Sequence, residues 1–202
     1  MKKKFILTGI LLCTIVLLSL SQQPPGKGKF TNFTEGGVLI GNSQDDKNAP
    51  FIFHSSVNYG FYKNLSAGIG VGVEFMKETY LPVTANVMYQ FRKDKSVFPF
   101  IRFRAGYQVA LENTTSMSNI NYYYWLLSNS AYYPYYPTAQ KLNTKGGWMF
   151  DPSVGVVVYT RPGLGISLAA GYRYQKLKYT GDNDYVLRTE YNRLMLTLGI
   201  TF

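Results

Sequence analysis

The last twelve residues of the chain, YNRLMLTLGITF (191–202), decide the fold class. From Leu194 to the final phenylalanine, large apolar side chains occupy every second position, and smaller or polar residues fill most of the positions between them. A period of two residues is the pattern of a β-strand with one apolar face. The apolar positions are Leu194, Leu196, Leu198, Ile200 and Phe202.

The same alternation recurs along the chain and predicts eight strands in all. Most of them are about 10 to 13 residues long, which suffices to cross the hydrocarbon layer at a tilt. The first is the weakest, because Phe33 falls out of phase with Val38 and Ile40. We predict an all-β fold, an eight-stranded antiparallel transmembrane β-barrel with up-and-down meander topology. The seven strands before the last are expected within residues 31–42, 51–61, 65–75, 81–92, 101–112, 148–159 and 166–175.

The two faces of these strands differ in a way that assigns inside and outside. One face carries large apolar residues, whereas the other is rich in glycine and polar groups rather than in the Lys and Glu of a wet surface. The interior of an eight-stranded barrel is just wide enough for packed side chains, so the small and polar face fits it. We expect the other face to meet lipid, with aromatic rings near its edges. These rings are Phe51, Phe53, Tyr59, Phe61, Phe75, Tyr89, Phe91, Trp148, Tyr172 and Phe202.

The predicted inward face also carries charged side chains. A plug of ion pairs is the favoured interpretation, because eight strands leave little room for a channel. A gated or anion-preferring pore remains the alternative. The predicted lumenal polar network comprises Glu74, Arg102, Arg104, Glu112, Asp151, Arg173 and Arg193.

The links between the strands predict which end faces outward. Barrels of this class have short periplasmic turns and longer extracellular loops. With both termini in the periplasm, the expected short links alternate with the longer ones in the required order. The short links are 63–64, 93–95 and 161–163, and the longer ones are 43–48, 76–80, 113–147 and 180–187.

The longest link contains the stretch YYYWLLSNSAYYPYYP (122–137), which is exceptionally aromatic. Its rings are suited to stacking on the sugars of lipopolysaccharide or a host glycan, or to contacting a protein partner. Alternatively, they extend the neighbouring strands and lie at the level of the lipid headgroups. The predicted surface-binding residues are Tyr122, Tyr123, Tyr124, Trp125, Tyr132, Tyr133, Tyr135 and Tyr136.

The N-terminus has the pattern of a secretory signal. Three lysines precede an apolar run over residues 5–20, which is too short to span a membrane and is followed by two prolines. We predict a signal peptide at 1–21, a periplasmic stub at 22–30 and the barrel at 31–202.

Cysteine and charge exclude other classes. Cys13 is the only cysteine and lies in the predicted signal, so a disulfide framework is not expected. A single histidine gives no basis for a transition-metal site, and we expect no metal or cofactor. Removal of the three lysines reduces the formal charge to 10 − 3 = +7. Because no Lys/Arg block follows the signal, we expect no nucleic-acid partner.

A terminal strand of alternating apolar residues closing on phenylalanine resembles the assembly signal of bacterial outer-membrane β-barrels. From about Thr31 to Phe202, the chain resembles the small barrel family typified by the OmpX and OmpA membrane domains. The resemblance implies an outer-membrane location in a Gram-negative bacterium, contact with outer-membrane lipid and lipopolysaccharide, and recognition of Leu198, Ile200 and Phe202 by the barrel-assembly machinery. Family members include adhesins, stability factors, small pores and a few lipid A enzymes, so the resemblance implies no single activity.

His54 and Ser56 share one face of the second predicted strand. A His-x-Ser pair with a carboxylate is used by barrel lipid A deacylases, in which histidine activates the serine. That family's pair lies late in the chain and faces lipid, whereas this pair is early and in the inward phase. We therefore expect a lumenal polar residue at His54 and no catalytic residues. A structural or surface-interaction role is favoured, with a narrow porin-like channel and then a lipid A-modifying enzyme as alternatives.

Overall fold

A computed structural model describes residues 28–41, 49–76, 78–91, 97–111, 115–117, 140–161, 163–181 and 186–202. Within these ranges, no helix is long and apolar enough to cross a membrane. The strands are β1 (Phe30–Ile40), β2 (Phe51–Gly60), β3 (Leu65–Phe75), β4 (Thr79–Gln90), β5 (Val97–Ala110), β6 (Thr115–Met117), β7 (Gln140–Arg161), β8 (Leu164–Thr180) and β9 (Val186–Thr201).

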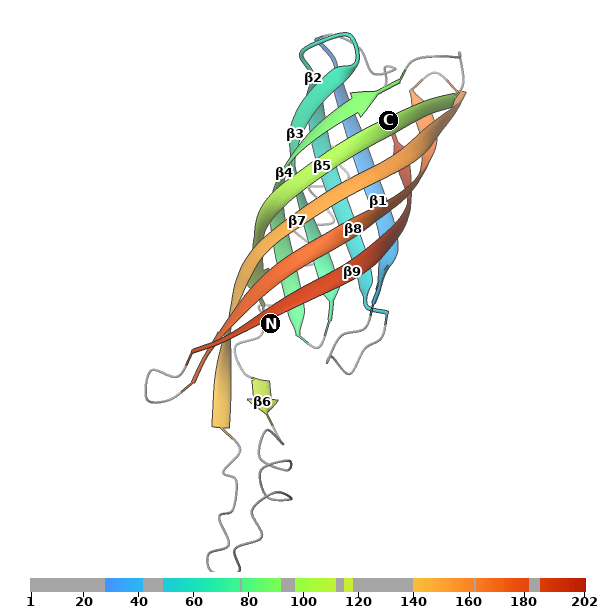
Figure 1. The fold of residues 1–202 in the computed structure, drawn as a ribbon. Coiled ribbons are helices and arrows are strands. Elements are labelled where there is room, and N and C mark those ends of the chain that lie inside the picture. Colours follow the sequence, from blue (N-terminus) through green and yellow to red (C-terminus); the bar gives the residue numbers. More distant parts are fainter. Residues whose placement is uncertain are drawn as a thin grey trace, which may run out of the picture.

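Eight of the strands form a closed antiparallel ring (Figure 1). Neighbours in sequence pair with one another, β5 pairs with β7, and β1 pairs with β9 to close the barrel. If paired residues are followed from Phe33 of β1 through β2 and each next strand of the ring, the path reaches Tyr191 of β9. In the direct pairing of β1 with β9, however, Phe33 lies opposite Thr201. The ring therefore closes with a stagger of ten residues (201 − 191 = 10), which requires strongly tilted strands. The predicted eight-stranded meander is confirmed.

The strands of one wall are longer than the sequence predicted. β7 has 22 residues, β8 has 17 and β9 has 16. They project beyond the other strands at one end of the barrel, where the short β6 pairs with the start of β7 (Figure 1). Part of the predicted loop 113–147 is therefore strand. The apolar alternation does not reveal these extensions, because their outward side chains are polar, as Lys176 and Lys178 show.

We call this projecting end the extended end and the opposite one the turn end. The predicted alternation of short and long links is wrong at one position, because the link 76–78 is shorter than the link 91–96. The extended end is thus distinguished mainly by the length of its strands. The turn-end links are 61–64, 91–96 and 162–163. The extended-end links are 41–50, 76–78, 111–139 and 181–185, and the third of these is interrupted by β6.

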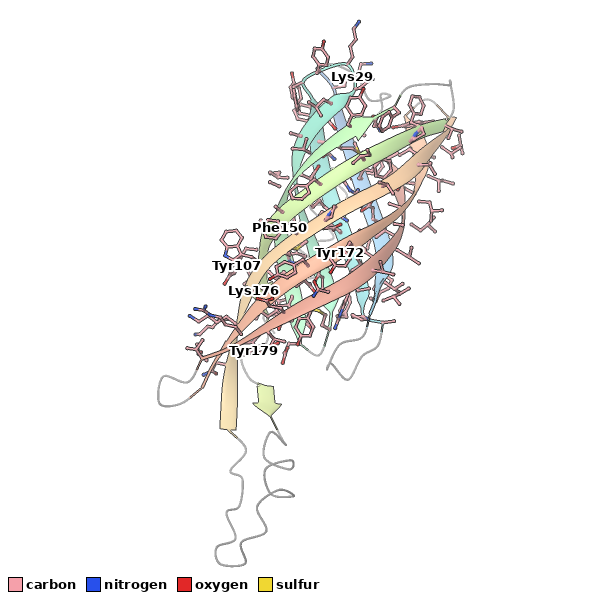
Figure 2. The ribbon with its side chains drawn as sticks, viewed as in Figure 1. Lys29, Tyr107, Phe150, Tyr172, Lys176 and Tyr179 are labelled. Atoms are coloured by element: carbon pink, nitrogen blue, oxygen red, sulfur yellow. The ribbon has the colours of Figure 1, made fainter. Side chains whose placement is uncertain are left out.

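The faces of the strands are assigned as the sequence predicts, with apolar residues outside (Figure 2). On β8, the outward residues from Leu164 to Tyr172 are apolar or aromatic, followed by Tyr174 and then Lys176. The segment 164–174 advances ten residues (174 − 164 = 10), about 33 Å along the strand and roughly 25 Å across the membrane at a tilt near 40°. That height matches the apolar band of outer-membrane barrels.

Phe202 is an exception to the predicted aromatic edge. It is only 7 % exposed, and its backbone exchanges hydrogen bonds with Asn32, at 2.7 and 3.1 Å. Leu198 and Ile200 do face outward. The last residue is therefore held in the ring beside β1 instead of facing lipid.

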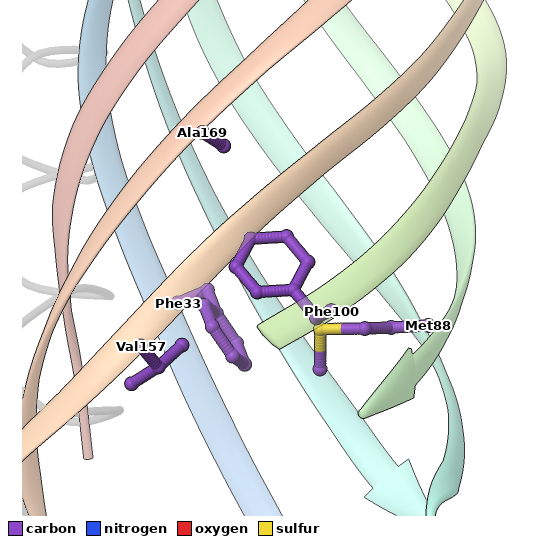
Figure 3. Packing of buried hydrophobic residues seen from close by; sticks show 5 residues of the cluster. All are labelled: Phe33, Met88, Phe100, Val157 and Ala169. Carbon is purple, nitrogen blue, oxygen red and sulfur yellow. The ribbon is translucent and has the colours of Figure 1, made fainter. Parts of the chain in front are cut away.

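The interior contains apolar clusters that the sequence did not predict. At the turn end, Phe33 packs with four other buried residues (Figure 3). Its out-of-phase position in the sequence follows from this inward orientation. The other members are Met88, Phe100, Val157 and Ala169.

A second buried cluster lies toward the extended end, and a third lies along β1, β2 and β9. The second contains Met76, Tyr80, Leu177 and Tyr179, and the third contains Leu39, Ile52 and Met195. Along β5 the inward residues accordingly change from Phe100 to the charged Arg102 and Arg104, and then to Ala110 beside the second cluster. Charged groups in the middle of the barrel are thus shielded by apolar groups on both sides.

The substitution Phe33→Ala tests the contribution of the turn-end cluster. Removing this buried ring leaves a cavity, so we expect the free energy of unfolding to fall by about 3–5 kcal/mol. Urea unfolding in lipid vesicles, followed by gel mobility of the folded form, measures the loss. Phe33→Leu refills most of the space and should cost less; equal unfolding midpoints for the wild type and Phe33→Ala would contradict the proposed packing role.

Candidate functional site

The centre of the barrel contains a continuous chain of charged side chains. Positive and negative groups alternate along it, and five strands contribute. Every member is at most 2 % exposed. In order of contact they are Arg102, Glu35, Arg104, Asp151, Arg173 and Glu74.

Glu35 of β1 joins the two arginines of β5. Arg102 Nη1 donates to Glu35 Oε1 at 2.6 Å, and Arg104 Nη1 donates to Glu35 Oε2 at 3.1 Å. Both carboxylate oxygens are therefore engaged by guanidinium groups, which present several donors in a fixed plane. The pairing connects the first strand to the opposite part of the ring through the lumen.

Asp151 of β7 extends the chain. Its Oδ2 accepts hydrogen bonds from Arg104 Nε at 3.0 Å and from Arg173 Nη2 at 3.0 Å. Arg104 thus contacts two carboxylates, those of Glu35 and Asp151, and lies at the middle of the chain. Removal of this single guanidinium would leave both carboxylates with one partner fewer.

Glu74 of β3 ends the chain toward the extended end. It forms an ion pair with Arg173 and accepts hydrogen bonds from Gln108 and from Gln175, the latter at 3.1 Å. Three positive and three negative groups are thereby balanced within the chain. Because each buried charge has an oppositely charged neighbour, the desolvation penalty is offset by short-range attraction and hydrogen bonding.

His54 borders this chain and has a defined tautomer. Arg104 Nη1 lies 3.1 Å from His54 Nδ1, and Thr84 Oγ1 lies 2.9 Å from His54 Nε2. A guanidinium has donors and no acceptor, so Nδ1 accepts and the ring proton is on Nε2, facing Thr84. His54 therefore contributes to the lumenal hydrogen bonds as a neutral ring.

Comparison with known proteins places the fold. No protein-family model and no curated protein sequence matches the chain. Neisserial surface protein A is similar, with a TM-score of 0.52 and 13% identity over 88% of this chain and 98% of that one. The N-terminal β-barrel domain of Pseudomonas aeruginosa OprF has a TM-score of 0.51 and 11% identity, covering 88% of this chain and 100% of that one. The outer membrane protein OprG from Pseudomonas aeruginosa has a TM-score of 0.52 and 9% identity, covering 90% of this chain and 97% of that one.

The chain has the fold of a small outer-membrane β-barrel. At these identities the similarity concerns the fold alone. This fold and the apolar exterior band agree with the predicted outer-membrane location, and a specific activity does not follow from them.

The predicted lumenal residues are distributed unevenly. Five of them belong to the chain of charges, namely Glu74, Arg102, Arg104, Asp151 and Arg173. Arg193 is also buried, with its guanidinium 5.1 Å from the ring centroid of Tyr191. Glu112 lies outside the described residues.

Glu35 is the member of the buried chain of charges that the sequence interpretation missed. It lies in the weakest predicted strand, where Phe33 obscured the alternation. The signal was nevertheless present, because Phe33, Glu35 and Gly37 are two residues apart and share the inward face of β1. An acidic residue in this phase would have supplied the missing partner for Arg102 and Arg104.

The predicted surface-binding tyrosines and tryptophan, within 122–136, lie outside the described residues. So does the predicted signal peptide at 1–21. Within the predicted stub, Gly28 donates to the carbonyl of Gly60 and Lys29 accepts from its amide, so hydrogen bonding of the barrel extends to residue 28. Surface binding and export remain predictions.

The substitution Glu35→Gln tests the chain of charges. It leaves the buried Arg102 and Arg104 with one carboxylate fewer, so we expect a loss of about 3–5 kcal/mol in the free energy of unfolding. Urea unfolding in vesicles measures it. Glu190→Gln, which removes one partner of the exposed pair with Lys176, is the matched control and should change the midpoint little. Equal effects of the two substitutions would contradict a stabilising role of the buried chain.

Proposed function

We propose that the protein is an integral outer-membrane barrel that acts through contacts at its extended, extracellular end and does not conduct solutes through its interior. The observation that carries this proposal is the continuous chain from Arg102 to Glu74, shielded by buried apolar clusters toward both ends. A chain of this kind occupies the lumen with side chains that hold one another in place.

The geometry of the barrel supports a closed interior. Eight strands enclose a space that packed side chains can fill, and here arginines supply the largest of them. Movement of any one arginine would leave at least one buried carboxylate with one charged partner fewer, which is costly. A narrow channel is therefore the less favoured function.

The extended end supports a role in surface contacts. β7, β8 and β9 project beyond the apolar band, and the longest link lies between β6 and β7. Its aromatic residues, Tyr122 to Tyr136, provide large and rigid contact area suited to a glycan or a protein partner. The projecting strands would present this link away from the membrane.

A lipid A-modifying activity receives no support from His54 and Ser56. Both side chains are buried in the lumen, and the histidine ring nitrogens are engaged by Arg104 and Thr84. A lipid substrate approaches such a barrel from its apolar exterior. The pair is therefore assigned to the lumenal hydrogen bonds.

Planar-bilayer recording tests the closed interior. Purified barrel should give no steady ion conductance, because the charges that would line a path are paired across it. Detergent-matched bilayers with and without an established porin provide the controls. Steady conductance that is abolished by charge swaps at Arg102 or Glu74 would contradict the proposal and support the narrow channel.

Deletion of residues 122–136 tests the surface role. We expect binding of intact cells to immobilised glycans, purified lipopolysaccharide or a protein partner to be lost while the urea midpoint of the barrel stays unchanged. A deletion of equal length cannot be made in another link, so reversal of the order of residues 122–136 serves as the composition-matched control. Unchanged binding together with a lower midpoint would show that the segment extends the strands instead.

A further inference from the structure

Three cationic side chains gather on the outward face of the extended end. In the β8–β9 register Lys178 lies directly opposite Arg188, and in the β7–β8 register it lies opposite Gly146, next to Lys145. All three cationic residues are exposed. We call Lys145, Lys178 and Arg188 the cationic row.

A β-bulge in β7 builds this row. The register shifts between Thr144 and Gly146, where Lys145 is the extra residue; Lys145 is exposed, whereas Gly146 and Gly147 are buried. Only glycine fits at 146, because its φ is 82° and a Cβ there would lie 1.9 Å from the carbonyl oxygen of Gln108. The hydroxyl of Tyr107 donates to the carbonyl of Lys145 at 3.1 Å and fixes the bulge from the neighbouring strand.

The row lacks the acidic partner that its neighbours have. In the next outward-facing pair toward the membrane, Lys176 Nζ lies 2.7 Å from Glu190 Oε1. Hydrogen bonds from Lys176 and, to a smaller extent, from Tyr174 lower the pKa of Glu190. Among the described residues, no ion pair is found for the cationic row. Like charges directly opposite on adjacent strands, such as Lys178 and Arg188, destabilise a sheet unless an anion neutralises them.

The row lies at the level of lipid headgroups. The apolar band on β8 ends at Tyr174, so Lys176 and Lys178 lie roughly 5 and 10 Å farther out along the membrane normal. The exposed indole of Trp148 lies opposite Lys176 and marks the interface (Figure 2 labels Tyr107, Tyr172 and Lys176 on this side). Anionic groups of the surrounding lipid therefore occur where the cations are.

We propose that the cationic row binds the phosphate groups of a phosphorylated glycolipid in the outer leaflet of the membrane. Three cations on adjacent strands, for which the described part of the chain shows no ion pair, match a doubly phosphorylated headgroup in charge, and the aromatic residues below them contact its acyl chains. Bound lipid would stabilise the projecting strands by neutralising the opposition of Lys178 and Arg188. The inference rests on the proposed orientation, with the extended end outward.

Purified full-length barrel in neutral detergent tests the site, with bisphosphorylated lipid A as the probe. Lipid A should raise the midpoint of thermal unfolding, followed by gel mobility, in the wild type. Lys178→Gln/Arg188→Gln should weaken the apparent affinity about 30-fold, since each cation near a membrane surface contributes about fivefold. Without lipid the same variant should be as stable as the wild type or more stable, because like charges are removed.

The matched control is Lys29→Gln/Lys63→Gln, which removes two cations at the turn end (Lys29 is labelled in Figure 2) and should retain wild-type affinity. Dephosphorylated lipid A should bind the wild type as weakly as the Lys178→Gln/Arg188→Gln variant, and inorganic phosphate should not reproduce the stabilisation. Equal affinity in all variants, equal losses in site and control variants, or stabilisation by free phosphate alone would overturn the proposal.

Orientation is measured separately. Cys13 is the only cysteine and lies in the predicted signal, so Asn143→Cys introduces a single thiol at the extended end. Labelling of Asn143→Cys in intact cells by a membrane-impermeant maleimide supports the proposed orientation, and labelling only after lysis contradicts it. If Asn143→Cys is labelled and lipid A does not bind, the phosphate site alone is refuted.

Discussion

Closure of the ring by β1 and β9 is the constraint on which the rest of the structure depends. Backbone groups in hydrocarbon have no water to bond, so a membrane-crossing sheet must leave no edge. Here the first and last strands of the barrel meet over a register from Phe33–Thr201 to Ile40–Leu194. Phe202 adds two further backbone hydrogen bonds to Asn32, so the terminal residue helps to complete the seam.

Closure of eight strands with a large stagger also determines what the interior must contain. The space is narrow, inward side chains from opposite strands meet, and buried charges require partners. Arginine suits this situation because one guanidinium can bridge two carboxylates from different strands, as Arg104 does between Glu35 and Asp151. Apolar clusters lie on both sides of these pairs, and ion pairs are stronger in such low-dielectric surroundings, so the groups that stabilise the barrel also fill its lumen.

The projecting wall of β7, β8 and β9 carries apolar outward residues in the membrane and charged ones beyond it. Along β8 and β9 the outward residues change from apolar to charged beyond Tyr174, while the backbone pairing continues without interruption to Thr180 and Val186. The strands therefore remain a hydrogen-bonded sheet beyond the bilayer. The cationic row lies on these three strands, and the aromatic stretch 122–137 precedes β7 in the chain. The proposed lipid contact and the proposed partner contact would therefore both depend on this wall.

The sequence by itself determined the strand number, the meander order and the facing of nearly every strand, because a period of two is a local property that any half-buried strand must show. It also determined that charges such as Arg102 and Asp151 lie inside. Only the tertiary structure decided which charges pair: Glu35 and Arg102 are far apart in the chain and meet through the stagger of ten residues, which no local pattern encodes. The inward orientation of Phe33 was likewise decided by packing across the lumen, and the outward orientation of Lys145 by a β-bulge. Neither effect changes the composition of the strand, so neither is visible in its local pattern.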